Sequence, residues 1–321
     1  MQLTSNHWGT YQYKTENGKV TALLPFGDDS QPSEIGQGIL DVLDGETRIT
    51  QPMVRQSWLE GGPGNSQPEK RGADRFVAID WDTASQLVGD ELQRVIDDHG
   101  NQAIFAGSYG WASAGRFHHA QSQIHRFLNT IGGYTKSKNT YSFAAAEVVI
   151  PHVLGSGLME LLTRQTSWQS VYKNTELLIA FGGLPAFNSQ ISNGGTGAHI
   201  QRFAARKAAA AGTRFVNMSP RRSDLKNDVP EDWLHMRPNT DVSVMLAMAH
   251  TLIVKRLHDV SFLERYTVGF DEFQAYLSGN TDGIPKTAEW AAAISGIAAA
   301  DIISLANEMA KKRTMLSVSW S

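Results

Sequence analysis

The sequence predicts an α/β fold, with Rossmann-like parallel sheets flanked by helices and a small β-rich segment in front. Two observations carry this prediction. From residue 76 onward, short apolar runs alternate with amphipathic stretches of about ten residues or more, as strands and helices do around a parallel sheet. Before residue 76, strand-like alternation and stretches rich in Gly, Pro, Asp and Ser replace this pattern.

The first predicted element is a β-hairpin over residues 8–24. The dipeptide Asn17-Gly18 separates YQYKTE from KVTALL, and Asn-Gly between alternating segments is a strong signal for a tight hairpin turn. Residues 25–68 are rich in turn-forming residues and predict extended loop with short strands rather than helix.

A first strand–helix alternation follows. FVAIDW (76–81) and AIFAG (103–107) are predicted strands. The helix between them is expected to have Asp82 as its N-cap and to stop at His99-Gly100. Residues 121–130 form the next predicted helix.

The second half of the chain repeats this alternation. The predicted strands are 176–181, 213–218 and 314–320, and the predicted helices are 199–211, 242–258, 287–294 and 298–312. Parallel sheets bind ligands at the carboxyl ends of their strands, where the strand order reverses. We therefore expect a site on the loops after 103–107, 177–181 and 213–218.

Composition excludes several classes of partner. The 321 residues are 41% hydrophobic and carry a net charge of −3, which gives no electrostatic case for nucleic acid. No run of 18 apolar residues exists, so no membrane insertion is expected. The N-terminus shows no signal peptide, so the protein as written is expected to be cytoplasmic; a mature or truncated N-terminus would instead allow the periplasm.

Residues 105–155 carry the most informative pattern, FAGSYGWASAG…GGYTKSKNTYSFAAAEVVIPHVLG. It contains Tyr109-Gly110-Trp111 and Tyr141-Ser142. The pattern resembles the dimethyl sulfoxide reductase family of molybdopterin oxidoreductases, in which this segment reads SYGW…GG(Y/F)…(D/T)YS…AA…PHV.G. The resemblance covers the whole chain but less than half of a typical member, so we expect a truncated, N-terminal portion.

The absence of cysteine indicates a branch of that family. Members bind molybdenum through cysteine, selenocysteine, aspartate or serine, and many hold an iron–sulfur cluster on N-terminal cysteines. Here His7-Trp8-Gly9 stands where cluster-binding relatives place cysteines. The resemblance therefore implies the serine-ligated branch without an iron–sulfur cluster, which reduces S-oxides and N-oxides.

The resemblance implies that Ser142 binds molybdenum and that Tyr109 and Trp111 line the metal pocket. The tyrosine hydroxyl would donate to the transferred oxygen, and the indole N–H would face an oxo or pterin group. Without the resemblance, the sequence also allows purely structural roles for these three residues. Ser142 is also placed as the N-cap of the helix-like run that follows it. The alternative for Tyr109 and Trp111 is that both are buried aromatics with satisfied polar tips.

The implied cofactor is bis(molybdopterin guanine dinucleotide), whose tails need phosphate and guanine contacts. Residues 217–224 (NMSPRRSD) resemble the family's N-P-x-R-T-E segment. Ser219 stands where asparagine or aspartate is usual, whereas Arg222 and Ser223 keep phosphate- or ribose-binding chemistry.

Two more segments complete the implied cofactor site. Residues 237–241 (RPNTD) match R-P-x-T-D and contain Asn239 and Asp241. Asp241 could accept N1–H and the exocyclic amine of guanine, or serve as an N-cap before VSVMLAMAH. In the loop 185–190, Phe187 replaces a lysine of some members, which favours the biotin sulfoxide or methionine sulfoxide type. Asn188 and Ser189 in this loop can still donate hydrogen bonds.

Three domains are predicted: a β-rich segment at 1–52, an incomplete α/β domain with the molybdenum-site loops at 53–150, and a Rossmann-like domain for a guanine dinucleotide tail at 151–321.

The predicted function is oxygen-atom transfer from a small substrate of the biotin sulfoxide, methionine sulfoxide, dimethyl sulfoxide or trimethylamine N-oxide type. A cytochrome or a reduced nicotinamide/flavin system would donate the electrons. The alternative is a non-catalytic nucleotide-binding α/β fragment. We expect the chain alone to be poorly soluble or partly molten and inactive.

Overall fold

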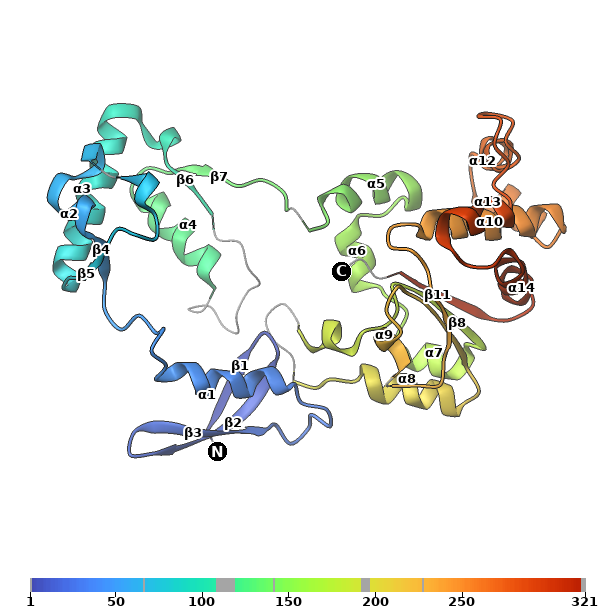
Figure 1. Cartoon of the computed structure of the whole chain (residues 1–321), viewed down its shortest axis with the longest axis horizontal. Coiled ribbons are helices and arrows are strands. Elements are labelled where there is room, and N and C mark those ends of the chain that lie inside the picture. Colours follow the sequence, from blue (N-terminus) through green and yellow to red (C-terminus); the bar gives the residue numbers. More distant parts are fainter. Residues whose placement is uncertain are drawn as a thin grey trace. The chain divides into compact units, whose positions relative to one another are not determined.

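The computed structural model describes residues 2–65, 67–107, 119–140, 142–191, 197–226 and 228–318. The chain has a mixed α/β fold, and its helices and strands are labelled along the chain in Figure 1. It divides into two compact units. Unit 1 comprises Met1–Leu158 and Ile191–Ala198, and unit 2 comprises Met159–Gln190 and His199–Ser321. This division joins the predicted segments 1–52 and 53–150 in one unit and ends it eight residues later than predicted.

Unit 1 begins with the predicted hairpin. β2 (Gly9–Glu16) and β3 (Lys19–Pro25) pair antiparallel, and β1 (Leu3–Asn6) adds a third strand beside β2. Asn17 and Gly18 both have positive φ, 50° and 78°, as a two-residue turn that follows the strand twist requires. The hairpin prediction is confirmed.

The segment 25–68 differs from its prediction because it contains short helices. These are α1 (Gly38–Leu43) and α2 (Gln56–Gly61). Gly and Pro at their ends do not prevent a helix of six residues; Gly62, with φ of 67°, ends α2. β4 (Met53–Arg55) pairs antiparallel with β5 (Phe76–Ala78).

The first alternation is present, with shifted ends. α3 (Trp81–His99) has Asp80 rather than Asp82 as its N-cap, and the Asp80 carboxylate accepts from the Thr83 N–H at 2.7 Å. A cap oxygen must lie about three residues before that N–H, which excludes Asp82. The remaining elements are α4 (Ala120–Thr130), α5 (Ala144–Leu154) and the parallel pair β6 (Phe105–Ala106) and β7 (Thr135–Lys136).

Unit 2 is built on one four-stranded sheet, and every pair of neighbouring strands in it is parallel. Its strands are β8 (Leu177–Phe181), β9 (Arg214–Met218), β10 (Asp232–Leu234) and β11 (Thr314–Val318), in the order β10-β9-β8-β11. The chain moves outward from β8 to β10 and then crosses to the other side for β11. The order therefore reverses between β8 and β11, and all carboxyl ends lie at one edge.

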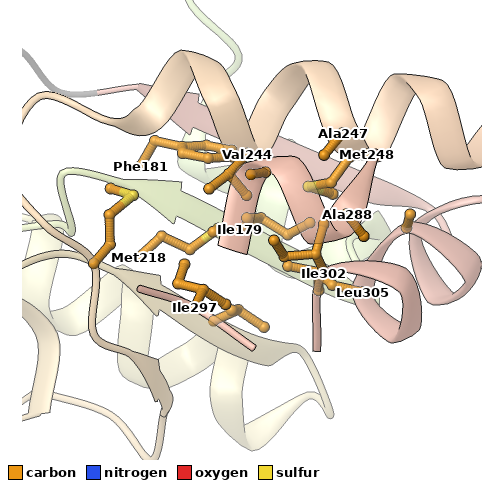
Figure 2. Packing of buried hydrophobic residues seen from close by; sticks show 14 of the residues in the cluster. Ile179, Phe181, Met218, Val244, Ala247, Met248, Ala288, Ile297, Ile302 and Leu305 are labelled. Atoms are coloured by element: carbon orange, nitrogen blue, oxygen red, sulfur yellow. The ribbon is translucent and has the colours of Figure 1, made fainter. Parts of the chain in front are cut away.

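Helices cover both faces of this sheet. Those whose buried residues pack on its strands are α7 (Trp168–Asn174), α8 (Gln201–Ala210), α9 (Ser223–Lys226), α10 (Asp241–Val254), α13 (Ala288–Ser295) and α14 (Ala299–Met309). The chain also forms α6 (Leu158–Thr163), α11 (Val260–Tyr266) and α12 (Phe270–Leu277). Alternate residues of β8 face opposite sides. Ile179 and Phe181 pack with α10, α13 and α14 (Figure 2), whereas Leu178 and Ala180 pack with α7 and α8.

Within the described ranges, no single helix is long and apolar enough to cross a membrane. α13 and α14 satisfy the length and composition together but are bent by 120° at their junction. Their residues Ala291, Ile302 and Ala306 are buried in the core that α10 shares.

Candidate cofactor site

Polar loops follow three neighbouring strands at the carboxyl edge of the unit 2 sheet. They are residues 182–190 after β8, 219–222 after β9 and 235–240 after β10. The predicted cofactor residues of this unit lie on these loops or at the first residue of the next helix: Asn188, Ser189, Ser219, Arg222, Ser223, Asn239 and Asp241. Because the strands are parallel, the structure brings them to one edge of one sheet.

At this edge, the loop after β8 lies close to the segment that follows β9. Gly183 has φ of 71°, and a Cβ there would lie 2.6 Å from the Asp224 Cβ and 3.2 Å from Asn217 Oδ1. Asn217 donates through Nδ2 to the Arg222 carbonyl at 3.2 Å, but its Oδ1 is buried without a partner in the described part of the chain. A buried, unpaired acceptor is costly unless something donates to it. An N–H group of a bound cofactor would satisfy this oxygen.

Ser219 has an internal role that the sequence did not predict. Its side chain is buried, its Oγ donates to Asp224 Oδ2 at 2.6 Å, and the same oxygen accepts from the Arg221 N–H at 3.1 Å. Arg221 also binds Asp224 Oδ1 through Nε and Nη2 at 3.0 and 2.6 Å. The hydroxyl therefore stabilises its own loop through its bonds to Asp224 and Arg221.

The loop after β8 is only partly open for hydrogen bonding. Ser189 donates through Oγ to the Ala186 carbonyl at 2.7 Å, inside its own 3-10 turn, so its proton is already used. Asn188 is exposed. The guanidinium carbon of Arg221 lies 5.7 Å from the ring centroid of Phe187, so a cation stands over the position where Phe187 replaces lysine.

Arg222 and Ser223 are exposed beside this edge. The Nε of Arg222 donates to Glu231 Oε1 at 3.0 Å, and its guanidinium carbon lies 5.9 Å from the ring centroid of Trp233. Ser223 is the first residue of α9. Neither Glu231 nor Trp233 was predicted to belong to the site, because no motif marks them.

The segment Arg237–Asp241 is held by the end of a helix. Arg237 donates through Nη1 to the carbonyls of Ala293 and Ile294 at 2.9 and 3.0 Å, which are among the last of α13. Such bonds satisfy carbonyls that have no partner within the helix. Asn239 turns the chain with φ of 62°.

Asp241 is the first residue of α10, and Thr240 occupies the N-cap position. The N-cap alternative for Asp241 is therefore wrong. Its carboxylate has no hydrogen bond or ion pair within the described residues, and it lies in the first turn of α10. Both oxygens remain available to a donor pair.

In unit 1, Ser142 is exposed, and its N–H donates to Thr140 Oγ1 at 3.3 Å. α5 begins at Ala144 with Phe143 in the N-cap position, so the cap position is not that of Ser142. Tyr109 and Trp111 lie outside the described residues. Among the residues that the structure does describe, no group of three or more His, Asp or Glu side chains could hold a metal.

A parallel sheet with polar loops and a glycine cradle at its carboxyl edge is characteristic of α/β proteins that bind a ligand there. Residues 48–320 match the molybdopterin oxidoreductase family, and residues 4–44 match the molybdopterin oxidoreductase N-terminal domain. The chain belongs to the molybdopterin oxidoreductase family, as the resemblance predicted. Membership implies molybdenum and a molybdopterin cofactor.

Similar proteins of known name agree with this assignment. The chain is 42% identical over 316 residues to the dimethyl sulfoxide/trimethylamine N-oxide reductase of Cereibacter sphaeroides, covering 98% of this chain and 38% of that protein. It is 39% identical to the trimethylamine-N-oxide reductase of Haemophilus influenzae, covering 99% and 38%. The biotin sulfoxide reductase of Cereibacter sphaeroides is 40% identical, with 92% and 40% covered.

The chain thus spans about two fifths of the length of these curated relatives. A solved structure, the acetylene hydratase from Pelobacter acetylenicus, shares the fold with a TM-score of 0.59 at 18% identity. The match covers 99% of this chain and 40% of that one.

Proposed function

We propose that this chain is the part of a molybdenum-dependent reductase that removes the oxygen atom of S-oxides or N-oxides. The observation that carries the proposal is the buried, unpaired Oδ1 of Asn217 beside Gly183, at the carboxyl edge of the sheet. The names of the relatives support the substrate class. The reaction takes two electrons and two protons from a separate donor and yields the sulfide or amine and water.

Unit 2 would hold one guanine dinucleotide tail of a bis(molybdopterin guanine dinucleotide) cofactor on a Rossmann-like sheet. Asp241 would accept the two adjacent N–H groups of guanine, which adenine does not offer. Arg222 and Ser223 would bind phosphate or ribose oxygens, and Asn217 Oδ1 would accept an N–H. When bound, the cofactor supplies a metal centre that exchanges two electrons with the substrate.

The remaining roles belong to unit 1. We propose that the Ser142 hydroxyl loses its proton and serves as an oxygen ligand for molybdenum, which its exposure permits. The Tyr109 hydroxyl would donate to the substrate oxygen, and the Trp111 indole N–H would orient the bound groups. No iron–sulfur cluster takes part in this proposal.

Chemical analysis distinguishes this function from a non-catalytic nucleotide-binding protein. The protein would be purified from its native host and assayed for molybdenum, and for guanosine monophosphate released by acid hydrolysis. The proposal expects two guanosine monophosphates for each molybdenum. A folded protein that contains neither would overturn the reductase assignment, and guanine without molybdenum would favour the non-catalytic alternative.

A further inference from the structure

Glu231 is a buried carboxylate beside the cofactor site, and only half of it is satisfied. Its side chain is 1% exposed. Oε1 accepts from the Nε–H of Arg222 at 3.0 Å, whereas Oε2 is buried with no partner in the part of the chain that the structure describes. A carboxylate buried in this way is stable only with a cation close by. Among the described residues, that cation is Arg222.

Arg222 is in turn held from three directions. Its carbonyl accepts from Asn217 Nδ2 at 3.2 Å, its Nε is bound by Glu231, and its guanidinium lies 5.9 Å from the ring centroid of Trp233. Trp233 is itself fixed, because its indole N–H donates to the Ser219 carbonyl at 2.8 Å. The Arg222 side chain is still 51% exposed. Its Nη1 and Nη2 have no bonding partner among the described residues.

We propose that Glu231 is a positioning residue, which turns Arg222 so that Nη1 and Nη2 meet a phosphate of the guanine nucleotide tail. With Nε occupied, the guanidinium offers only its two terminal nitrogens, a fork that matches two oxygens of one phosphate. This inference rests on the proposed function.

Glu231 could affect phosphate binding through its charge or through the orientation of Arg222, and these two effects have opposite signs. A carboxylate near an anion site repels the anion, so its removal would strengthen phosphate binding if charge decided the outcome. If Glu231 instead aims Arg222, neutralising its carboxylate weakens binding, because a neutral acceptor holds the Arg222 Nε–H less strongly and the ligand must then order the guanidinium.

The test is titration of the whole chain with guanosine diphosphate, as a probe for the tail, and with guanosine, which lacks phosphate. We expect Glu231→Gln to weaken guanosine diphosphate binding about tenfold and to leave guanosine binding unchanged. Asp232→Asn is the matched control, since it makes the same change of charge at the next residue, where Asp232 pairs with Arg214 at 2.7 Å. Arg222→Lys keeps the charge without the fork and should reproduce the loss.

The outcomes separate this inference from the function on which it rests. A wild-type chain that binds neither probe overturns the nucleotide site together with the role of Glu231. Normal wild-type binding, with equal or tighter guanosine diphosphate binding by Glu231→Gln, overturns the role of Glu231 alone. An equal loss for guanosine also overturns it, because the effect would then be one of folding. If Glu231→Gln does not fold, unchanged diphosphate binding by Arg222→Lys overturns it.

Discussion

The Oγ of Ser219 lies 2.6 Å from Oδ2 of Asp224, and both side chains are buried. The bond closes the loop after β9 over the end of its own strand. Since Arg221 binds the other carboxylate oxygen, this loop has a shape of its own before any ligand arrives.

Ser219→Ala is expected to destabilise the protein. The substitution removes a donor from a buried carboxylate, and such a loss costs about 1–3 kcal/mol in the free energy of unfolding. Urea denaturation would measure it. Ser223→Ala, at an exposed serine four residues later, is the control and should stay within about 0.5 kcal/mol of the parent. Equal stability of both variants would contradict the internal role of Ser219.

Lys286→Met tests a buried cation in unit 2. Lys286 is 2% exposed, donates to Asp282 Oδ2 at 2.6 Å, and lies 4.4 Å from the ring centroid of Tyr276. We expect a loss of about 2 kcal/mol by thermal or urea unfolding, because the ion pair and the aromatic contact vanish together. Lys312→Met removes an exposed lysine with the same i,i+4 spacing to an acid and should cost far less. A reversed ranking would refute this reading.

Stability should fall in mild acid partly because of His250. Burial lowers the pKa of His250, and the nearby Glu289 carboxylate only partly opposes this. The unfolded chain therefore binds the proton more readily, so this contribution is complete above the ordinary histidine pKa of about 6.5 and is lost as the pH falls below it. His250→Gln should flatten the pH dependence of the free energy of unfolding, and an unchanged pH dependence in this variant would contradict the contribution of His250.

Asp241→Asn should reduce discrimination by the proposed guanine pocket. Inosine diphosphate lacks the exocyclic amine, so the parent chain should bind guanosine diphosphate about tenfold more tightly than inosine diphosphate. The variant should bind both alike. Asp301→Asn, also an acid in the first turn of a helix, should keep the parent ratio. A parent chain without preference would exclude Asp241 as the guanine contact.

Ser142→Ala, in the complete enzyme, should abolish or cripple oxide reduction and leave the fold intact. The alanine removes a metal ligand, whereas Phe143 rather than Ser142 holds the N-cap position, so the unfolding free energy should change by less than about 0.5 kcal/mol. Ser137→Ala changes another exposed serine of the same segment and should retain activity. Full activity of Ser142→Ala would rule out the ligand role.

Much of the unit 2 fold could be predicted because its central strands β8 and β9 are buried on both sides. ELLIAF and TRFVNM appear as apolar runs between helical patterns, and β8 and β9 occupy 177–181 and 214–218. β10 was missed because its three residues, Asp232–Leu234, are too few to show a period. The helices α1 and α2 were missed because six residues among Gly and Pro resemble a loop in composition.

The residues of the candidate site could be predicted where a sequence motif marks them. The residues that hold them in place, from outside these motifs, could not be predicted. The loops after β8 and β9 were expected from strand ends, and the structure places both at one edge. Glu231 contacts Arg222 from across a loop, and Ala293 accepts from Arg237 over a separation of 56 residues. No sequence motif marks either contact, since each depends on how the folded chain brings the two residues together.

The position of β11 beside β8 also constrains how unit 2 can fold. Next to this strand pair, Arg313 donates its N–H to Glu176, 137 residues away along the chain. Closing so long a loop is entropically unfavourable until the helices between have packed. β8, β9 and β10 can therefore associate early, while the edge of β8 that pairs with β11 is still unpaired. During synthesis that edge of β8 stays unpaired until β11 has been made, and an unpaired strand edge is a place where chains can aggregate.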